Sequence, residues 1–408
     1  MGALTGAQRR ASDAIGLPGN SFLWFSFLLN ANGFYAQALD HTVRIGFVVN
    51  PIAGMGGSVG LKGTDGTDIQ KEALARGARK LSPVKAGEAL ESIRSSGLAL
   101  EILTCSGEMG EQELKNAGFD HRVVYKAGAS TTGADTKEAA RRFIAEKVDL
   151  ILFAGGDGTA RDLLDAVDAR VPMLGIPSGV KMHSSVFALM PDDVGDIVKA
   201  FASAGLTKDA EVMDVDEEAY RRGALQVRLF GTAKVPDERA HMQSSKMVYH
   251  SGTADEEARE LGQYIAETME MGVIYVLGPG STTGAIAENL GQRKTVLGVD
   301  VFRDGKALLN DASEAALLSL LPETGRASII VTPIGAQGFI FGRGNQQISS
   351  KVIARVGPEN VTIIATPSKL AGTPVLRVDT GDKSLDEALR GRRKVVTGYK
   401  RKKLVRVE

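Results

Sequence analysis

The most constraining feature of this 408-residue sequence is an apolar run that ends in a glycine-rich turn. Residues 148–153 are almost all apolar, as in a strand that is buried on both faces of a parallel sheet. The turn Gly155-Gly156-Asp157-Gly158-Thr159 follows, and residues 159–170 then have helical periodicity, with Thr159 expected to cap the helix. A strand, a sharp turn and a helix in this order predict one unit of an α/β sheet.

The same alternation extends over residues 43–200. Apolar runs at 43–49, 98–103, 122–126 and 173–176 alternate with helical patterns at 83–96 and 135–147, the second with Asp135 as its expected cap. We therefore predict an α/β fold whose N-terminal domain, residues 43–200, is a doubly wound parallel sheet. Ligands bind such sheets at the carboxyl ends of the strands, where the glycine-rich loops of this sequence fall.

Strand patterns predominate in residues 201–408, which we predict to be a β-rich α+β domain. Helices are expected at 253–271 and 311–321, a helical run follows the loop at 278–283, and Asp304-Gly305 is a hairpin turn signal. The tail, residues 394–408, alternates apolar and basic residues and is expected to be one final strand with a solvated face. The predicted strands lie at residues 224–233, 273–277, 295–302, 328–332, 361–365, 374–378 and 394–408.

The composition excludes several classes of protein. Lys and Arg together number 49, as do Asp and Glu, so the formal net charge is zero, and a nucleic-acid or membrane-surface binder would need a basic excess. The hydrophobic content of 43% argues against disorder. Cys105 is the only cysteine, so no intrachain disulfide is possible, and we expect a buried thiol without chemical function.

Residues 1–42 form an N-terminal extension of uncertain status. An apolar run at 22–29, with Arg9 and Arg10 before it, has the pattern of a short signal peptide. A packed extension and a misassigned start are the alternatives. We expect a cytoplasmic protein, because a single cysteine suits a reducing compartment. We also expect a homo-oligomer.

The turn around Asp157 indicates phosphate binding. Its glycines let backbone N–H groups approach an anion, and the start of the following helix favours negative charge. A carboxylate in such a loop would repel the phosphate unless it binds Mg²⁺ or accepts a proton from an attacking hydroxyl. Asp157 is therefore the candidate catalytic and metal-binding residue, against the alternative of a plain Gly-Asp turn before a helix.

Three further loops follow predicted strands and carry candidate ligand-binding residues. The alternatives to ligand binding are a flexible loop at 50–66, a surface position for Lys181, a structural role for His183 and a plain Gly/Thr-rich turn at 278–283. Arg161, in the first turn of the helix after Asp157, is disfavoured there by the helix dipole and is a candidate partner of an anion. With the residues around Asp157, the candidate binding set is Asn50, Gly54, Gly56, Gly57, Lys62, Gly155, Gly156, Gly158, Thr159, Arg161, Ser178, Lys181, His183, Gly280, Ser281 and Thr282.

The combination of Gly-Gly-Asp-Gly-Thr after a buried strand with Asn-Pro-x-x-Gly after the first strand resembles the superfamily of NAD kinases and diacylglycerol or sphingosine kinases. The loops at 50–66, 155–162, 175–183 and 278–283 are similar to those of the ATP-NAD kinase branch that includes the acetoin-catabolism protein X family. This resemblance extends from Val43 to the C-terminus and implies a nucleotide site between two domains, with residues 201–408 completing the acceptor site. It also implies that Asp157 is the base and the phosphate or metal partner.

The resemblance implies a kinase that transfers the terminal phosphoryl group of ATP, or of another donor, to the adenosine-ribose 2′-hydroxyl of NAD, with Mg²⁺. The sequence departs from ordinary NAD kinases at Arg161, and its Asn310-Asp311 and Thr332-Pro333-Ile334-Gly335 only partly match the dinucleotide-binding runs. A kinase for a lipid or another small hydroxyl acceptor, and a non-catalytic nucleotide sensor, are therefore the alternative functions.

Overall fold

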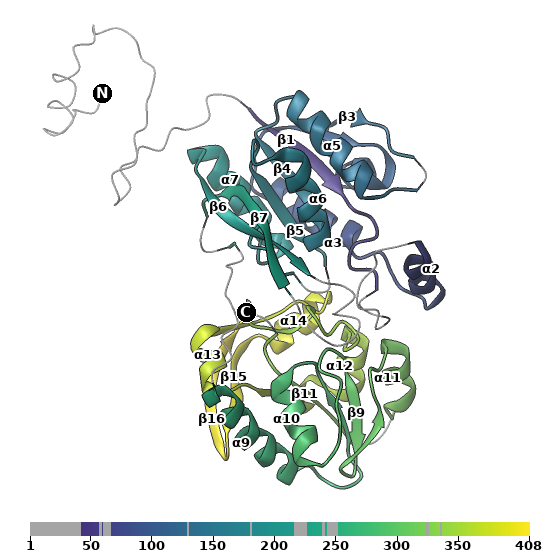
Figure 1. Cartoon of the computed structure of the whole chain (residues 1–408), viewed down its shortest axis with the longest axis vertical. Coiled ribbons are helices and arrows are strands. Elements are labelled where there is room, and N and C mark those ends of the chain that lie inside the picture. The colour runs from purple at the N-terminus through teal and green to yellow at the C-terminus, as the bar shows by residue number, and fades with distance from the viewer. Residues whose placement is uncertain are drawn as a thin grey trace, which may run out of the picture.

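The computed structural model consists of two α/β domains, one above the other in Figure 1. It describes residues 42–56, 59, 67–128, 130–179, 182–215, 227–238, 241–242, 252–322, 326–334 and 337–408. The apolar run at 22–29 lies outside these residues. Within the described ranges, no helix combines the length and the apolar composition needed to span a bilayer.

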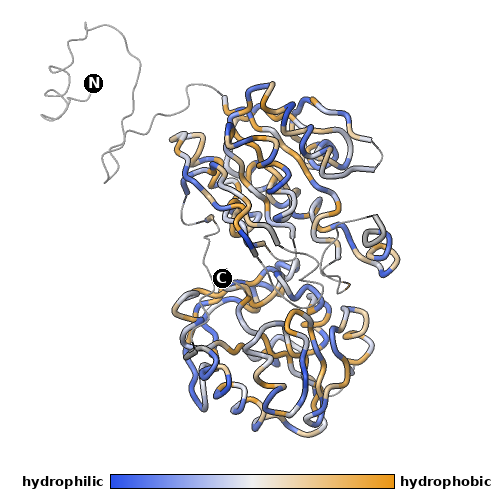
Figure 2. The backbone as a smooth tube through the Cα atoms, in the orientation of Figure 1, coloured by the Kyte–Doolittle hydropathy of each residue, from blue (hydrophilic) through white to orange (hydrophobic). Residues whose placement is uncertain are grey.

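The first domain contains a five-stranded parallel sheet with the order β3-β2-β1-β4-β5. Its strands are short and apolar, and orange segments follow them through the middle of the domain in Figure 2. The strands are β1 (Val43–Val49), β2 (Leu100–Cys105), β3 (Arg122–Tyr125), β4 (Leu150–Gly155) and β5 (Met173–Pro177). The helices are α2 (Thr67–Ala75), α3 (Ser82–Ser95), α4 (Glu111–Asn116), α5 (Gly133–Ala145), α6 (Asp157–Val167) and α7 (Val194–Ala204), with short 3₁₀ turns at Gly107–Met109 and Pro191–Asp193.

The direction of winding reverses between β1 and β4. The chain runs from β1 outward to β2 and β3, then returns to β4 on the other side of β1 and continues to β5. Because crossovers between parallel strands are right-handed, α3 covers one face of the sheet while α5 and α6 cover the other. The doubly wound sheet expected from the sequence is therefore present. Its switch point, where ligands bind in sheets of this type, lies at the ends of β1 and β4.

An antiparallel hairpin extends the first domain. It consists of β6 (Thr207–Val215) and β7 (Val227–Pro236), and it packs against α6, α7 and β5. Ala210, Val212, Ala233 and Val235 are buried in the same apolar core as the five-stranded sheet. The core of the first domain thus includes residues beyond 200. The domain boundaries expected from the sequence, 43–200 and 201–408, stay predictions.

The second domain is built on a nine-stranded mixed sheet with the order β10-β9-β8-β11-β13-β15-β16-β14-β12. The predicted hairpin turn is present, with φ of 53° at Asp304 and 73° at Gly305. The strands are β8 (Ile274–Leu277), β9 (Asp300–Arg303), β10 (Lys306–Leu309), β11 (Ala327–Val331), β12 (Phe339–Phe341), β13 (Val361–Ile364), β14 (Val375–Val378), β15 (Gly391–Gly398) and β16 (Arg401–Val407). The helices are α9 (Gly252–Thr268), α10 (Ser281–Asn289), α11 (Glu314–Leu320), α12 (Ser350–Val356), α13 (Pro367–Gly372) and α14 (Lys383–Leu389), with a 3₁₀ turn at Pro358–Asn360.

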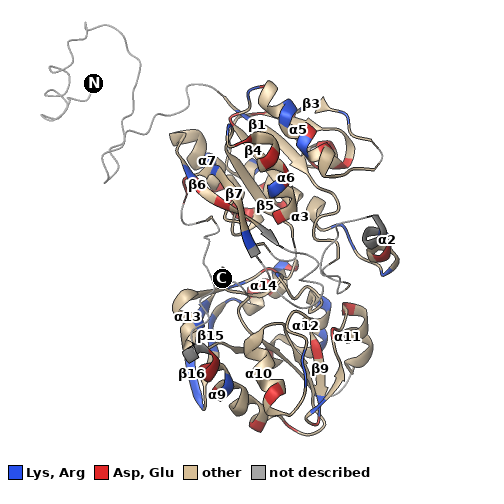
Figure 3. Ribbon diagram, in the orientation of Figure 1, with Lys and Arg blue, Asp and Glu red and all other residues tan. Residues whose placement is uncertain are grey.

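Three local expectations were wrong. The tail is a hairpin of β15 and β16 rather than one strand, because the chain reverses at Lys400, whose φ is 56°. The basic residues of β16, blue in Figure 3, are exposed. Helix α5 is capped by Thr132, with Asp135 as the reciprocal partner of a capping box. Helix α6 begins at Asp157, so Thr159 lies inside its first turn and does not cap it.

Candidate active site

The loops after β1 and β4 lie together at the switch point. The two strands are parallel neighbours, with Val49 opposite Ala154. The Asn50 N–H donates to the Ala154 carbonyl oxygen at 2.9 Å, and the Asn50 side-chain Nδ2 donates to Thr159 Oγ1 at 3.0 Å. The expectation that these two loops lie side by side is therefore met, and Thr159 joins them through its hydroxyl.

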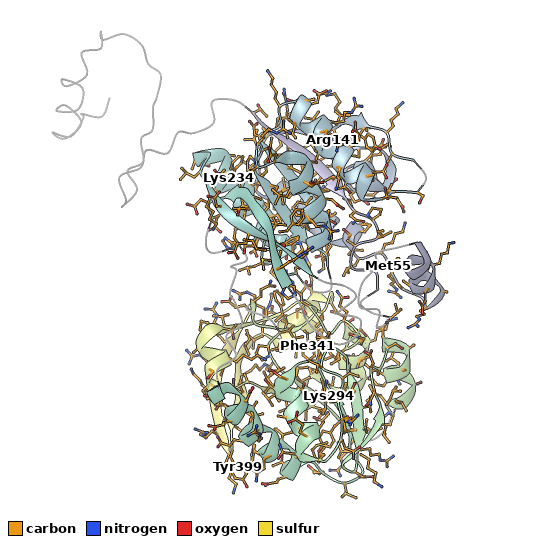
Figure 4. The ribbon with its side chains drawn as sticks, in the orientation of Figure 1. Met55, Arg141, Lys234, Lys294, Phe341 and Tyr399 are labelled. Carbon is orange, nitrogen blue, oxygen red and sulfur yellow. The ribbon has the colours of Figure 1, made fainter. Side chains whose placement is uncertain are left out.

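A third loop, after β5, closes on the first two. Ser178 is buried, and its N–H donates to the Gly155 carbonyl oxygen at 3.0 Å. Gly54 has φ of 75°, and a Cβ at this position would lie 1.9 Å from the Ser178 carbonyl oxygen. This close approach requires glycine at position 54, and it brings residues of three predicted loops into one site. Met55, labelled in Figure 4 beside α2, anchors the first loop by packing against Ala73 and Ala78.

Asp157 is buried at the centre of this site, as the first residue of α6. Its Oδ2 accepts a hydrogen bond from the His183 N–H at 2.7 Å, and its Oδ1 accepts one from the Ser184 N–H at 3.0 Å. Burial raises the pKa of Asp157, while the hydrogen bonds from Ser184 and His183 oppose this shift by stabilising the carboxylate. The carboxyl group is thus fixed in orientation, and each oxygen keeps a lone pair for a further partner.

The start of α6 has no side-chain cap, because the residue before Asp157 is Gly156. Uncapped N–H groups at a helix start, together with the positive end of the helix dipole, form a site for a phosphate. A Cβ at Gly156 would lie 3.4 Å from the Gly179 Cα, so the backbones of two loops approach closely here. The strand, turn and helix expected from the sequence are present here, and the binding of phosphate stays a prediction.

A metal at this site would depend on few protein ligands. Within the described part of the chain, no three His, Cys, Asp or Glu side chains cluster in a way that could hold a metal. Mg²⁺ commonly binds through one or two carboxylates, substrate phosphates and water, so Asp157 beside a phosphate fits this metal. Asp157 would hold the ion, and the ion would neutralise phosphate charge.

The other candidate residues around Asp157 are placed as follows. Gly155 ends β4, Gly158 lies in the first turn of α6, and Gly56 is buried in the first loop. Arg161 is half-buried on α6. His183 contributes through its backbone N–H, a role that side-chain patterns in a sequence do not reveal. Gly57, Lys62 and Lys181 lie outside the described residues.

The loop after β8 repeats the strand-turn-helix pattern in the second domain. Gly280 precedes α10, and the hydroxyl of Thr283 donates to the carbonyl oxygens of Gly278 and Gly280, at 2.7 and 2.9 Å. Thr282 is buried, whereas Ser281 is exposed. The predicted residues Gly280, Ser281 and Thr282 therefore share one helix start.

Lys369 is a residue of this second loop site that sequence reasoning missed. Its Nζ donates to Thr332 Oγ1 at 3.1 Å and to Thr282 Oγ1 at 3.4 Å. No local pattern singles it out, because these partners lie 37 and 87 residues away in the chain. The lysine comes to the loop only through the pairing of β8, β11 and β13 in one sheet.

The two loop sites are connected through the segment after β11. Thr332 follows this strand, and Gln337, five positions further on, donates from Nε2 to the Met182 carbonyl oxygen at 3.4 Å. Met182 precedes His183, which binds Asp157. The Arg343 side chain adds a second link between the domains by donating to the Gln337 side chain and to the Leu189 carbonyl oxygen.

A doubly wound sheet with an uncapped helix start and a fixed aspartate at its switch point is typical of α/β proteins that bind phosphate groups. The ATP-NAD kinase N-terminal domain matches residues 45–205, and the ATP-NAD kinase C-terminal domain matches residues 271–407. The chain belongs to the ATP-NAD kinase family. This confirms the resemblance to that family, and the kinase-family domains support a phosphotransferase.

The solved structures to which the chain is similar include distant ones. A diacylglycerol kinase from Bacillus anthracis str. Sterne is 18% identical over 44% of this chain and 48% of its own, with a TM-score of 0.22. The substrate-binding protein LivJ of a branched-chain amino acid transporter from Streptococcus pneumoniae is 11% identical over 81% of this chain and 67% of its own, with a TM-score of 0.23. The chain spans less than half of the diacylglycerol kinase structure. Comparison with curated proteins gives no match.

Proposed function

We propose that this protein is an NAD kinase that transfers the terminal phosphoryl group of ATP, or of another donor, to the adenosine-ribose 2′-hydroxyl of NAD. The observation that carries the proposal is the fixed carboxylate of Asp157, held by two backbone N–H groups at an uncapped helix start. Family membership supports the phosphotransfer itself. The choice of NAD rests on the resemblance of the loops to those of NAD kinases.

In the proposed reaction, the 2′-oxygen of NAD attacks the terminal phosphorus, and the bond from this phosphorus to the ADP oxygen breaks. The proton of the 2′-hydroxyl passes to Asp157, and the products are ADP and NADP. Burial raises the pKa of Asp157, which makes it a better proton acceptor than an exposed aspartate. The backbone N–H groups at the start of α6 and in the glycine loops stabilise the phosphate charge without having to reorganise.

The proposed binding residues fall into two groups. The three loops of the first domain would bind the phosphates of the donor and Mg²⁺, and the loop at Gly280, Ser281 and Thr282 would bind the other substrate. Arg161 and His183 would contact anionic groups from the edge of the first site. A cytoplasmic location and a homo-oligomer remain part of this proposal.

The test is NADP formation by the purified full chain with ATP, Mg²⁺ and NAD. Asp157→Asn removes the proton acceptor and the metal ligand, so we expect the rate to fall at least about 100-fold. Asp165→Asn is the matched control, because Asp165 lies exposed on the same helix and pairs with Lys137 at 2.6 Å. The control should retain the wild-type rate, and circular dichroism should show that both variants are folded.

Two outcomes would contradict the proposal in different ways. An Asp157→Asn variant that forms NADP at the wild-type rate would exclude Asp157 as the base. Phosphorylation of diacylglycerol or another hydroxyl compound without any NADP would exclude NAD as the acceptor and leave a phosphotransferase with a different substrate.

A further inference from the structure

The start of α10 is open to an anion. Gly280 occupies the cap position with φ of 122° and has no side chain, so no side chain caps the nine-residue helix. The backbone N–H groups of the first turn point out of the helix end, where they favour negative charge. A Cβ at Gly280 would lie 3.1 Å from Thr332 Cγ2, so the ends of β8 and β11 approach closely around this helix start.

Lys369 points its ammonium group at the same place. Its Nζ lies within hydrogen-bonding distance of the hydroxyls of Thr332 and Thr282, both of which are buried. Each hydroxyl oxygen accepts from the ammonium group, and its own hydrogen remains available for an acceptor. One ammonium group, two hydroxyls and the N–H groups of a helix start therefore converge.

The charge of Lys369 is uncompensated among the described residues, where no carboxylate lies within ion-pair distance of it. Lys85, which is buried, pairs with Asp379 at 2.7 Å and with Glu88 at 3.0 Å. The Lys294 ammonium group is bonded to the carbonyl oxygens of Thr295 and Gly298. Lys369 is half-buried. A partly desolvated cation without a counter-charge is unfavourable, and a bound anion would offset this cost.

We propose that Lys369, Thr282, Thr332 and the start of α10 form a binding site for the phosphate group of a small molecule. The described part of this cluster contains no carboxylate corresponding to Asp157, so the site binds its ligand and does not transfer a group. Two sources of the phosphate fit the same chemistry: the diphosphate of NAD, in which case the inference rests on the proposed function, or a separate phosphorylated metabolite.

The test is isothermal titration of the full chain with inorganic phosphate, and separately with NAD. We expect two classes of phosphate site in the wild type. In Lys369→Met, the phosphate affinity of one class should be at least about tenfold weaker. Lys351→Met is the control, because it removes the same charge from an exposed position on α12. Thr282→Val provides a second variant if Lys369→Met does not fold.

The pH dependence gives an independent readout. Burial lowers the pKa of Lys369 to about 8, so the ammonium group loses its proton as the pH rises through this value. Phosphate affinity at this site should therefore fall above about pH 8 in the wild type. Phosphate binding by Lys369→Met should not show this fall. Equal phosphate binding in wild type and Lys369→Met, or no binding to the wild type beyond a single site, would overturn the proposal.

The NAD titration distinguishes the two sources. If the site holds the diphosphate of NAD, Lys369→Met weakens NAD binding and phosphate competes with NAD. If it holds a separate metabolite, NAD binding is unchanged while phosphate binding is lost. Asp157→Asn should retain the Lys369 site in either case, so failure of the kinase proposal and failure of this inference are separable.

Discussion

Asp157 obtains its setting from residues far along the chain. The two N–H groups that hold its carboxylate belong to residues 26 and 27 positions later. The sequence indicates that a carboxylate in a glycine-rich turn binds a metal or accepts a proton, but it does not show which groups orient the carboxylate. At the scale of single residues, composition and spacing predict the chemistry, and the fold supplies the geometry.

Gly54→Ala should disrupt the site. The added Cβ would lie 1.9 Å from the backbone oxygen of Ser178, and the φ of 75° is unfavourable for alanine. We expect a loss of more than about 2 kcal/mol in the free energy of unfolding, measured with urea, together with weaker ATP binding.

Gly97→Ala is the control for Gly54→Ala, because it introduces backbone strain without a steric clash. Gly97 has φ of 71°, and a Cβ added there would meet no atom within 4 Å, so strain alone should cost about 1 kcal/mol. Equal destabilisation by the two substitutions would show that the contact between Gly54 and Ser178 is not tight.

Strand positions were the most predictable elements. The runs at 43–49, 122–126 and 173–176 correspond to β1, β3 and β5 within one residue at each end, because apolar runs between turn residues are a local signal. Helix starts were less predictable. The caps of α5 and α6 are Thr132 and Gly156, each three residues before the expected cap, because several residue types near a helix start can occupy the cap position.

Cys105, the last residue of β2, should be chemically inert. The thiol is fully buried, and burial raises its pKa to about 12, so thiolate is scarce near neutral pH. We expect no reaction of the native protein with Ellman's reagent at pH 8 and one thiol titrated in urea. Ser95→Cys, at an exposed position of α3, should add one rapidly reacting thiol, whereas rapid labelling of the native wild type would contradict the burial of Cys105.

At the scale of the whole molecule, a few buried polar contacts join the domains. Lys85 on α3 pairs with Asp379 after β14 at 2.7 Å, and the exposed fractions of the two side chains are 7% and 11%. Phe341, labelled in Figure 4, is buried in the core of the second domain beside this junction, where Asp379 N–H donates to its carbonyl oxygen. The domain arrangement therefore depends on contacts between residues from both halves of the chain.

Asp379→Asn should weaken this arrangement. It leaves the buried Lys85 with Glu88 as its remaining carboxylate partner, so we expect a loss of about 2 kcal/mol, measured from the urea unfolding midpoint. Glu108→Gln is the control, because it removes the exposed pair of Glu108 with Lys80 and should change stability by less than about 1 kcal/mol. A midpoint shift no larger for Asp379→Asn than for the control would contradict a structural role for the pair.

The sequence by itself determined the alternation of strands and helices, the parallel sheet and the turn that carries Asp157, because periodicity and glycine placement are local. Only the tertiary structure decided which groups hold Asp157, that Lys369 meets Thr282, and that Lys85 meets Asp379 294 residues away. Such contacts depend on strand order and domain packing, which bring distant residues together without leaving a pattern around either one.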